Sequence, residues 1–315
     1  MSAASKAEAR ALAVVEASGQ ELRRHRKYEW REIALFAALI LPNMTLIVVF
    51  AYWPTLYNLF LSFTDWDFVQ PSATFVGLKK WQELFESSEF YTVLWNTLVF
   101  TLFTVIGTLI AGLGIALLLA QKLRFSAVVR TLTFAPHMIA GAVVGILFLF
   151  MFDPQYGISR MVFEWFGASS PQWTATSKWS LWAIIIAYSW QRVGFVTIIY
   201  YAAILDLPHD VMEAADVDGA HGWQKFRQMT FPLLRPVNYF MLITSIIAST
   251  QAFDIIATLT SGGPGYSSST LTWSIYKKAF QEFDIGSSAA QSMVLFALLM
   301  VATIFQVKLS NRKDS

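Results

Sequence analysis

Long stretches without a charged side chain constrain this chain more than any other feature of its sequence. Residues 33–64 and 90–121 contain no Asp, Glu, Lys or Arg. About 20 consecutive apolar residues are enough for an α-helix to cross the hydrocarbon core of a bilayer. Because lipid offers no hydrogen bonds to the backbone, such stretches cross the membrane as helices. The sequence therefore predicts an all-α integral membrane protein whose first partner is the lipid bilayer.

Four further apolar stretches bring the expected number of membrane-spanning helices to six. Spans three to six are expected at 131–152, 179–205, about 237–259 and 285–307. The composition supports this assignment, because only 14% of the residues are charged, whereas soluble domains carry about 25%. The net charge of +2 is too small to indicate a nucleic-acid partner.

The distribution of Lys and Arg sets the expected orientation. With both termini in the cytoplasm, 16 of the 23 Lys and Arg residues fall in cytoplasmic segments and six fall outside. Cytoplasmic loops carry the excess of basic residues, so the N-in, C-in arrangement is expected. Residues 1–32 then form a cytoplasmic arm, not a cleavable signal peptide, because the basic stretch lies too far from the start. Residues 311–315 form a cytoplasmic tail.

A polar segment at 206–236 separates the fourth span from the fifth and is expected in the cytoplasm; we call it the coupling segment. It contains five acidic residues, three basic residues and three prolines. Pro208 suits the first turn of a helix, and Asp210 is favourable near a helix N-terminus. A short helix is therefore predicted over 211–218.

The remainder of the coupling segment is predicted to turn and then to form a second short helix. Gly219 and Gly222 break the first helix, because glycine is the residue that turns most readily. The second helix is expected over 223–229, and Pro232 and Pro236 stop it before the fifth span. Two short helices joined by a glycine turn form a compact unit that can transmit a force.

The spacing within this segment resembles the cytoplasmic loop of permeases from binding-protein-dependent ABC importers. Glu213-Ala214-Ala215 is followed after three residues by Gly219, and after nine more by Met229-Thr230-Phe231-Pro232. That loop usually ends Ile-x-Leu-Pro, so Met and Phe are departures that keep the hydrophobic character. The resemblance covers most of 33–310, extends to the Gly-Gly-Pro-Gly stretch at 262–265 and to 286–292, and is closest to carbohydrate-uptake permeases of the glycerol-3-phosphate type.

The resemblance implies a permease domain over 33–310 without catalytic activity, in the cytoplasmic (inner) membrane of a bacterium. It would carry a sugar or a solute of the glycerol-3-phosphate or glycerophosphodiester type. The implied partners are a second homologous permease, two ATP-binding subunits and an extracytoplasmic solute-binding protein. The chain lacks the G-x-x-x-x-G-K-[ST] phosphate loop, so ATP and Mg are expected on the partner ATPase and no cofactor on this chain. The residues implied at the ATPase contact are Glu213, Ala214, Ala215, Asp218, Gly219 and Pro232.

Three segments match regions that line the pathway in related sugar permeases. The first contains His137, which follows Pro136, and the second runs over 190–195 in the fourth span. The third lies on the fifth span, where spacings of four and three place its residues on one helix face. The implied pathway residues are His137, Gln191, Arg192, Phe195, Ser245, Ser249 and Ala252.

Arg192 is the residue that bears most on the solute. It lies near the centre of its span, where a charge costs at least about 2.5–3.5 kcal/mol and therefore faces a wet cavity or a partner. A guanidinium is suited to phosphate, so one hypothesis is that Arg192, with His137, favours a phosphate-bearing solute. The alternative is that Arg192 pairs with an acid such as Asp254 or with the partner permease.

Other features have simpler explanations. The Gly141-x-x-x-Gly145 pair is expected to serve helix packing, and Asp254 is expected at the outer interface. His25 and His221 lack metal-ligand spacing, so no metal site is predicted. An ion-coupled secondary transporter is the alternative function, but it would predict central acids, internal repeats and discontinuous helices. A membrane-embedded enzyme would need a larger polar cluster than His137 and Arg192 supply.

Overall fold

The computed structural model describes residues 30–121 and 126–311. The expected arm at 1–32 and tail at 311–315 lie almost wholly outside the described residues. The chain divides into two compact units, Met1–Tyr57 and Asn58–Ser315. The described part is almost entirely helical. Four of its helices are long and apolar enough to cross a membrane, or up to six spans if each of two bent helix pairs counts as one.

The first predicted span is confirmed as a helical stretch of suitable length and apolarity, Ile33–Leu61. It consists of α2 (Trp30–Ile47), the π-helical turn η1 (Val48–Tyr52) and α3 (Trp53–Leu61). Pro54 is the second residue after the π-helical turn. A proline has no N–H and its ring clashes with the carbonyl four residues earlier, so the wider turn accommodates it without ending the helix.

The second, fourth and sixth predicted spans are confirmed as single long helices within the second unit. They are α5 (Ser88–Leu119), α9 (Ser180–Leu205) and α16 (Ile285–Asn311). The helices α5 and α9 pack against each other, and Ala116 and Val196 are buried in a core shared with α13. The central part of the unit is therefore built on α5 and α9.

The third predicted span is wrong as one continuous helix. The structure has α6 (Ser126–Phe134), the 3₁₀ turn η2 (Ala135–Met138) and α7 (Gly141–Met151), and the two helical parts bend by 101°. Pro136 gives the physical reason, because it removes a backbone donor and cannot continue an α-helix smoothly. Ile139 then takes an extended conformation with ψ of 134°.

The fifth predicted span ends earlier than expected. The helix α13 (Arg235–Thr250) stops before the polar Gln251, and α14 (Asp254–Leu259) begins after a short non-helical link. The helix α14 packs on α7 instead of extending α13. A Cβ atom at Gly145 would lie 1.8 Å from the Thr258 hydroxyl, so only glycine permits this approach. The expectation that the Gly141 and Gly145 pair serves packing is thus confirmed.

The coupling segment forms the two short helical regions that were expected, with shifted ends. These are α10 (His209–Val217) and a second region made of α11 (Trp223–Lys225), the π-helical turn η3 (Phe226–Thr230) and α12 (Phe231–Leu233). Pro208 is the N-cap of α10, not its first residue. Pro232 lies in the first turn of α12, so it does not stop the helix; a 70° bend at Leu234 does.

The elements opposite the coupling segment include a small departure from an all-α fold. The antiparallel pair β1 (Thr64–Asp65) and β2 (Thr74–Phe75) precedes α4 (Lys79–Glu86). Two further short helices in the connections are α8 (Ile158–Trp165) and α15 (Leu271–Phe280). The buried Lys80 Nζ lies 3.0 Å from an Asp65 carboxylate oxygen and 3.1 Å from one of Asp284, which ties β1, α4 and the start of α16 together.

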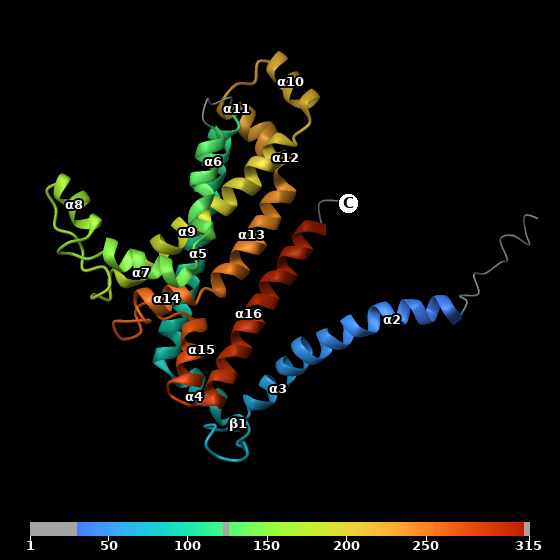
Figure 1. Cartoon of the computed structure of the whole chain (residues 1–315), viewed down its shortest axis with the longest axis vertical. Coiled ribbons are helices and arrows are strands. Elements are labelled where there is room, and N and C mark those ends of the chain that lie inside the picture. Colours follow the sequence, from blue (N-terminus) through green and yellow to red (C-terminus); the bar gives the residue numbers. More distant parts are fainter. Residues whose placement is uncertain (1–29, 122–125, 312–315) are drawn as a thin grey trace, which may run out of the picture. The chain divides into compact units, whose positions relative to one another are not determined.

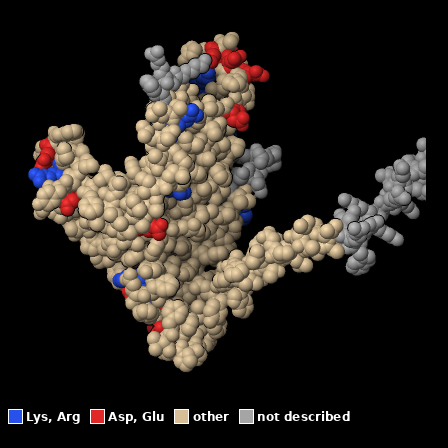
Figure 2. Space-filling model, viewed as in Figure 1, with Lys and Arg blue, Asp and Glu red and all other residues tan. Residues whose placement is uncertain are grey.

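Figure 1 shows how these elements are arranged along the second unit. The coupling helices α10 and α11 lie at one end, whereas β1, α4 and α15 lie at the other. In Figure 2, acidic side chains gather over α10, and the surface between the two ends is mostly uncharged. A surface that is mostly uncharged between the two ends is what a membrane-spanning unit requires.

Candidate functional site

The first candidate site is the turn that follows α10. Gly219 has φ of +81°, a conformation in which glycine pays no steric penalty. The Ala220 N–H donates to the Ala215 carbonyl at 2.9 Å and closes the end of α10 in the manner of a glycine C-cap. Ala215 and Ala220 are both buried. The turn is therefore a defined structure and not a loose loop.

A second set of contacts fixes the two helical regions of the coupling segment to each other. The Lys225 ammonium forms an ion pair with Asp216 across the turn at 2.5 Å. Leu234, at the bend before α13, is 1% exposed and belongs to the core shared by α5, α9 and α13. This core therefore fixes the end of the coupling segment to the long helices.

The residues that the sequence assigns to the ATPase contact do not all face outward. Glu213, Ala214, Asp218 and Gly219 are exposed, whereas Ala215 is buried and Pro232 is half-buried. Ala215 and Pro232 therefore contribute to the packing of the coupling segment and less to its exposed surface. Sequence reasoning missed Val217 and Trp223, which are 87% and 72% exposed beside the turn. Their apolar character in a polar stretch was the available signal, since exposed apolar patches mark interaction surfaces.

The second candidate site lies near the middle of α9, around Arg192. The Arg192 guanidinium carbon lies 5.6 Å from the centre of the Phe195 ring and 6.0 Å from that of Tyr188. The His137 ring lies 5.1 Å from the Phe195 ring. Phe195 thus brings the first and second predicted pathway segments together. Among the described residues, the buried His137 Nδ1 has no hydrogen-bond partner.

Arg192 lines a crevice with Ser245 of the third predicted segment, and we call it the Arg192 crevice. Its volume is only about 10 Å³, and its other walls come from Tyr188 and Val196 on α9 and from Thr104, Val105 and Thr108 on α5. A space of 10–15 Å³ holds about one water molecule. The crevice therefore connects α5, α9 and α13 but has no room for a solute in this conformation.

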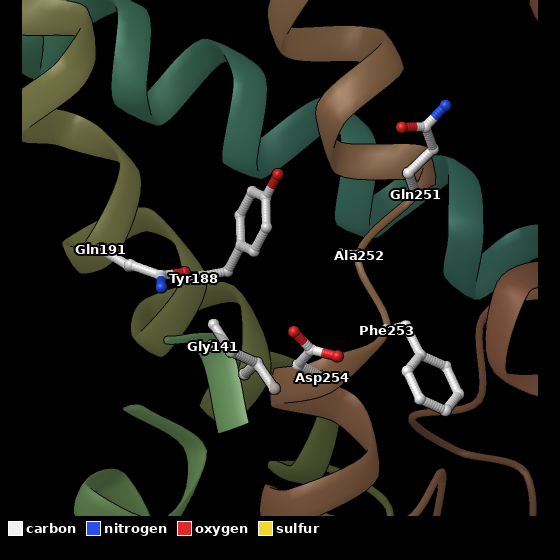
Figure 3. Close-up of a pocket in the computed structure, with 8 residues that line it drawn as sticks. Gly141, Tyr188, Gln191, Gln251, Ala252, Phe253 and Asp254 are labelled. Atoms are coloured by element: carbon white, nitrogen blue, oxygen red, sulfur yellow. The ribbon is translucent and has the colours of Figure 1, made fainter. Parts of the chain in front are cut away.

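A larger cavity of about 190 Å³ lies where the breaks in the third and fifth spans meet α9. We call it the Asp254 cavity, and Figure 3 shows the Asp254 carboxylate directed into it beside Gly141, with Tyr188 and Gln191 on the facing helix. Gln191 donates from Nε2 to the Ile139 carbonyl at 2.7 Å, which ties α9 to the break after η2. The remaining lining residues are Gln251, Ala252, Phe253 and Ile255.

Four of the seven predicted pathway residues line these two spaces, whereas His137, Phe195 and Ser249 line neither. Gln191 and Ala252 line the Asp254 cavity, whereas Arg192 and Ser245 line the Arg192 crevice. Ala252 follows the end of α13, so it does not share a helix face with Ser245 and Ser249, contrary to expectation. Ser249 is buried and its hydroxyl donates to the Ile246 carbonyl.

Asp254 and Tyr188 line these spaces, although sequence reasoning did not assign them to a pathway. Asp254 was expected at the outer interface, but it lines a cavity with Gln191 and Tyr188. Tyr188 lines both spaces. It precedes Arg192 by about one helical turn, and this spacing is the sequence signal that could have identified it. No ion pair joins Arg192 to Asp254 in the described part of the chain. Within those same residues, no group of three or more potential metal ligands is present.

Comparison with known proteins gives consistent matches over most of the chain. A family model described as the inner membrane component of binding-protein-dependent transport systems matches residues 104–315. A probable ABC transporter permease protein of Pyrococcus horikoshii is 35% identical over 266 residues, covering 83% of this chain and 91% of that protein. An sn-glycerol-3-phosphate transport system permease protein of Shigella flexneri is 32% identical over 273 residues, covering 86% and 92%.

A solved structure shares the fold at lower sequence identity. It is the crystal structure of a bacterial alginate ABC transporter in complex with a periplasmic protein that holds an alginate pentasaccharide. The matched chain is 23% identical, with a TM-score of 0.78, covering 92% of this chain and 98% of that one. The broken third and fifth spans therefore occur within a fold that a known importer also has.

Proposed function

The chain belongs to the family of inner membrane components of binding-protein-dependent transport systems, as an ABC transporter permease, and we propose that its coupling segment receives the force of ATP hydrolysis. The supporting observation is the geometry of that segment. A capped turn exposes Glu213, Asp218 and Gly219 at one end of the unit, while Leu234 anchors it in the core of the long helices. Such a surface suits docking into a cleft of an ATPase.

The proposed assembly contains this chain, a second homologous permease, two ATP-binding subunits and an extracytoplasmic solute-binding protein. We propose six spans with both termini in the cytoplasm of a bacterium, in which α6 and α7 together form the third span and α13 forms the fifth. The separation of α10 from α4 and α15 along the unit supports this orientation. Closure of the ATPases would push on α10 and rock the long helices between inward- and outward-facing states.

We propose that the solute is a sugar, or a glycerol-3-phosphate type of compound, and the two spaces of the pathway favour the sugar. The Asp254 carboxylate is exposed to the larger cavity, where it accepts hydrogen bonds from hydroxyl groups and repels a phosphate. Phe253 and Tyr188 add the aromatic surface that sugars pack against. The Arg192 crevice would suit phosphate by charge, yet it holds only about one water molecule.

An ion-coupled mechanism would predict the breaks in the third and fifth spans, and also the acid Asp254 at one of these breaks. It is nevertheless not favoured. The family match and the coupling segment both indicate drive from a separate ATPase. The breaks are also compatible with an importer, because the alginate transporter has this fold.

Co-purification tests the proposed assembly. The tagged full-length chain, extracted in a mild detergent and analysed by mass spectrometry, should bring down a homologous permease and an ATPase. A Glu213→Lys variant should keep the permease and lose the ATPase, because a reversed charge at the docking surface opposes binding. The control is Glu86→Lys, an equally exposed glutamate on α4 at the opposite end, which should keep both. Solute uptake that persists without any ATPase would refute the proposal.

A further inference from the structure

A groove of about 360 Å³ between α6 and α9 shares no lining residue with the Arg192 crevice or the Asp254 cavity. Its walls combine one charged side chain with apolar surface. The lining residues are Ala127, Arg130, Thr131, Phe134 and Ile198. A space that is basic at one point and apolar elsewhere suits an amphipathic ligand.

Arg130 is held in a fixed orientation without a counter-charge. Its Nη1 donates to the Tyr201 hydroxyl at 3.3 Å, and the guanidinium lies 5.0 Å from the centre of the Tyr201 ring. Its Nε donates to the Ser126 carbonyl at 3.3 Å. No acidic side chain pairs with Arg130 in the described part of the chain. No acid among these residues balances the positive charge of the guanidinium, and donors remain for an anion, since Arg carries five N–H groups.

The depth of Arg130 corresponds to the surface of a bilayer. The helix α6 begins at Ser126 and α9 ends at Leu205, so Arg130 and Tyr201 each lie four residues, or about 6 Å, inside their helix ends. Both ends face the part of the unit that carries α11 (Figure 1), which is the cytoplasmic end in the proposed orientation. Phe134 and Ile198 lie about one turn deeper, where acyl chains begin.

We propose that this groove binds an anionic phospholipid of the cytoplasmic leaflet. Arg130 contacts the head-group phosphate, which a planar guanidinium binds through paired donors. The upper part of an acyl chain lies against Phe134 and Ile198, and Ala127 lies beside the head group. Negatively charged lipids gather at the cytoplasmic surface and are attracted to basic residues there. The site goes beyond the proposed transport function, because lipid binding requires neither solute nor ATPase; it uses only the proposed orientation.

Lipid binding to the delipidated full-length chain in neutral detergent tests the site. The probes are phosphatidylglycerol and phosphatidylcholine with identical acyl chains, and native mass spectrometry measures their relative affinity. We expect phosphatidylglycerol to bind at least about fivefold more tightly, because the choline cation of phosphatidylcholine offsets the charge of the phosphate that both lipids carry, and the attraction of an anionic lipid surface for one Arg is about 1 kcal/mol. Arg130→Gln should remove this preference and Arg130→Lys should keep part of it. The matched control is Arg227→Gln, an exposed arginine of the same end, which should leave the preference unchanged.

A second variant keeps the charge and closes the groove. Ala127 is exposed at the surface of α6, so Ala127→Trp should fold and place an indole in the head-group end of the groove, and it should lower the affinity for both lipids. Equal affinity of the wild-type chain for the two lipids, or a preference that survives Arg130→Gln, overturns the proposal. Displacement of phosphatidylglycerol by an equal concentration of inorganic phosphate also overturns it, since the groove would then be a free-anion site.

Discussion

The coupling segment and the solute pathway are built in opposite ways. The coupling segment comes from one continuous stretch, 206–236, and its contacts are mainly local, such as the Ala220 to Ala215 hydrogen bond and the Lys225–Asp216 ion pair. The two spaces proposed as the pathway are assembled from α5, α9, α13 and the breaks before α7 and α14. The coupling segment is held mainly by contacts within one stretch of the chain. The two spaces form only where helices that are distant in the sequence pack together.

This difference separates the expected effects of substitutions in the two regions. A change in the coupling segment alters the transmission of force, so it should affect uptake of every solute equally. A change in the pathway alters contacts with the solute, so its direction should depend on the charge of that solute. Variants in the two regions can therefore be distinguished by measuring both the maximal rate and the apparent affinity of uptake.

The largest expected effect is that of Gly219→Pro. Proline fixes φ near −65°, whereas Gly219 requires +81°, and the substitution also removes the N–H that bonds to the Asp216 carbonyl at 3.1 Å. Uptake should fall to background while the amount of chain in the membrane stays normal, as shown by immunoblotting of membrane fractions.

The control for this variant is Gly114→Ala in α5. No atom lies within 4 Å of a Cβ placed at Gly114, so the added methyl group should change neither uptake nor membrane content. If Gly219→Pro transports at the normal rate, the turn after α10 is not the coupling element, and the contrast between the two regions fails.

Asp254→Asn should give the next largest effect, and its sign identifies the solute class. The Asn side chain keeps an acceptor oxygen, so a sugar would exchange a charge-assisted hydrogen bond for a neutral one, and its apparent affinity should weaken about five- to tenfold with an unchanged maximal rate. A phosphate-bearing solute would instead gain affinity, because a repulsive charge is removed. Uptake assays over a range of solute concentrations measure both quantities.

A suitable control for the cavity variant is Asp67→Asn, which keeps the oxygen that accepts from the Val69 and Gln70 N–H groups on an exposed loop. It should leave uptake as it is. An apparent affinity that does not respond to Asp254→Asn for any solute would show that the Asp254 cavity is not part of the pathway.

Arg192→Gln should have a smaller effect on a sugar, less than about threefold in apparent affinity, because the Arg192 crevice leaves no room for the solute. For glycerophosphate the phosphate hypothesis predicts the opposite, a loss of more than about tenfold. Normal apparent affinity for glycerophosphate in this variant would end that hypothesis. Measurement of both solutes in one strain background makes the comparison direct.

The contrast also explains which features the sequence could predict. The coupling segment follows from local rules, since Gly219 specifies a turn and an acidic first turn favours a helix, so its position was correct to within a few residues. The apolar runs likewise predict α5, α9 and α16. The breaks after Phe134 and Thr250 were missed, because hydropathy measures how apolar a segment is and not whether it stays straight. The proximity of Asp254 to Gln191 depends on tertiary packing, which no local pattern encodes.

Lys80→Met lies outside both regions and should change stability with the least effect on transport. Burial alone would lower the pKa of Lys80, but hydrogen bonds to Asp65 and Asp284 outweigh it and raise that pKa above 10.5. For Asp284, burial would raise the pKa, but hydrogen bonds from Ser287 and Lys80 lower it below 3.8. Loss of the ammonium should destabilise the protein by about 1–2 kcal/mol near neutral pH.

The pH dependence of this variant gives the sharper result. The contribution of Lys80 is complete below pH 10.5 and is lost as the pH rises through its raised value, while that of Asp284 is complete above pH 3.8 and is lost as the pH falls through its lowered value. The difference in thermal stability between wild type and variant should therefore stay constant across the neutral range and shrink at both extremes. The twelve tryptophans permit measurement by intrinsic fluorescence. A variant that unfolds at the wild-type temperature near pH 7, or that loses uptake while folded, would show that the Lys80 contacts do not simply hold β1, α4 and α16 together.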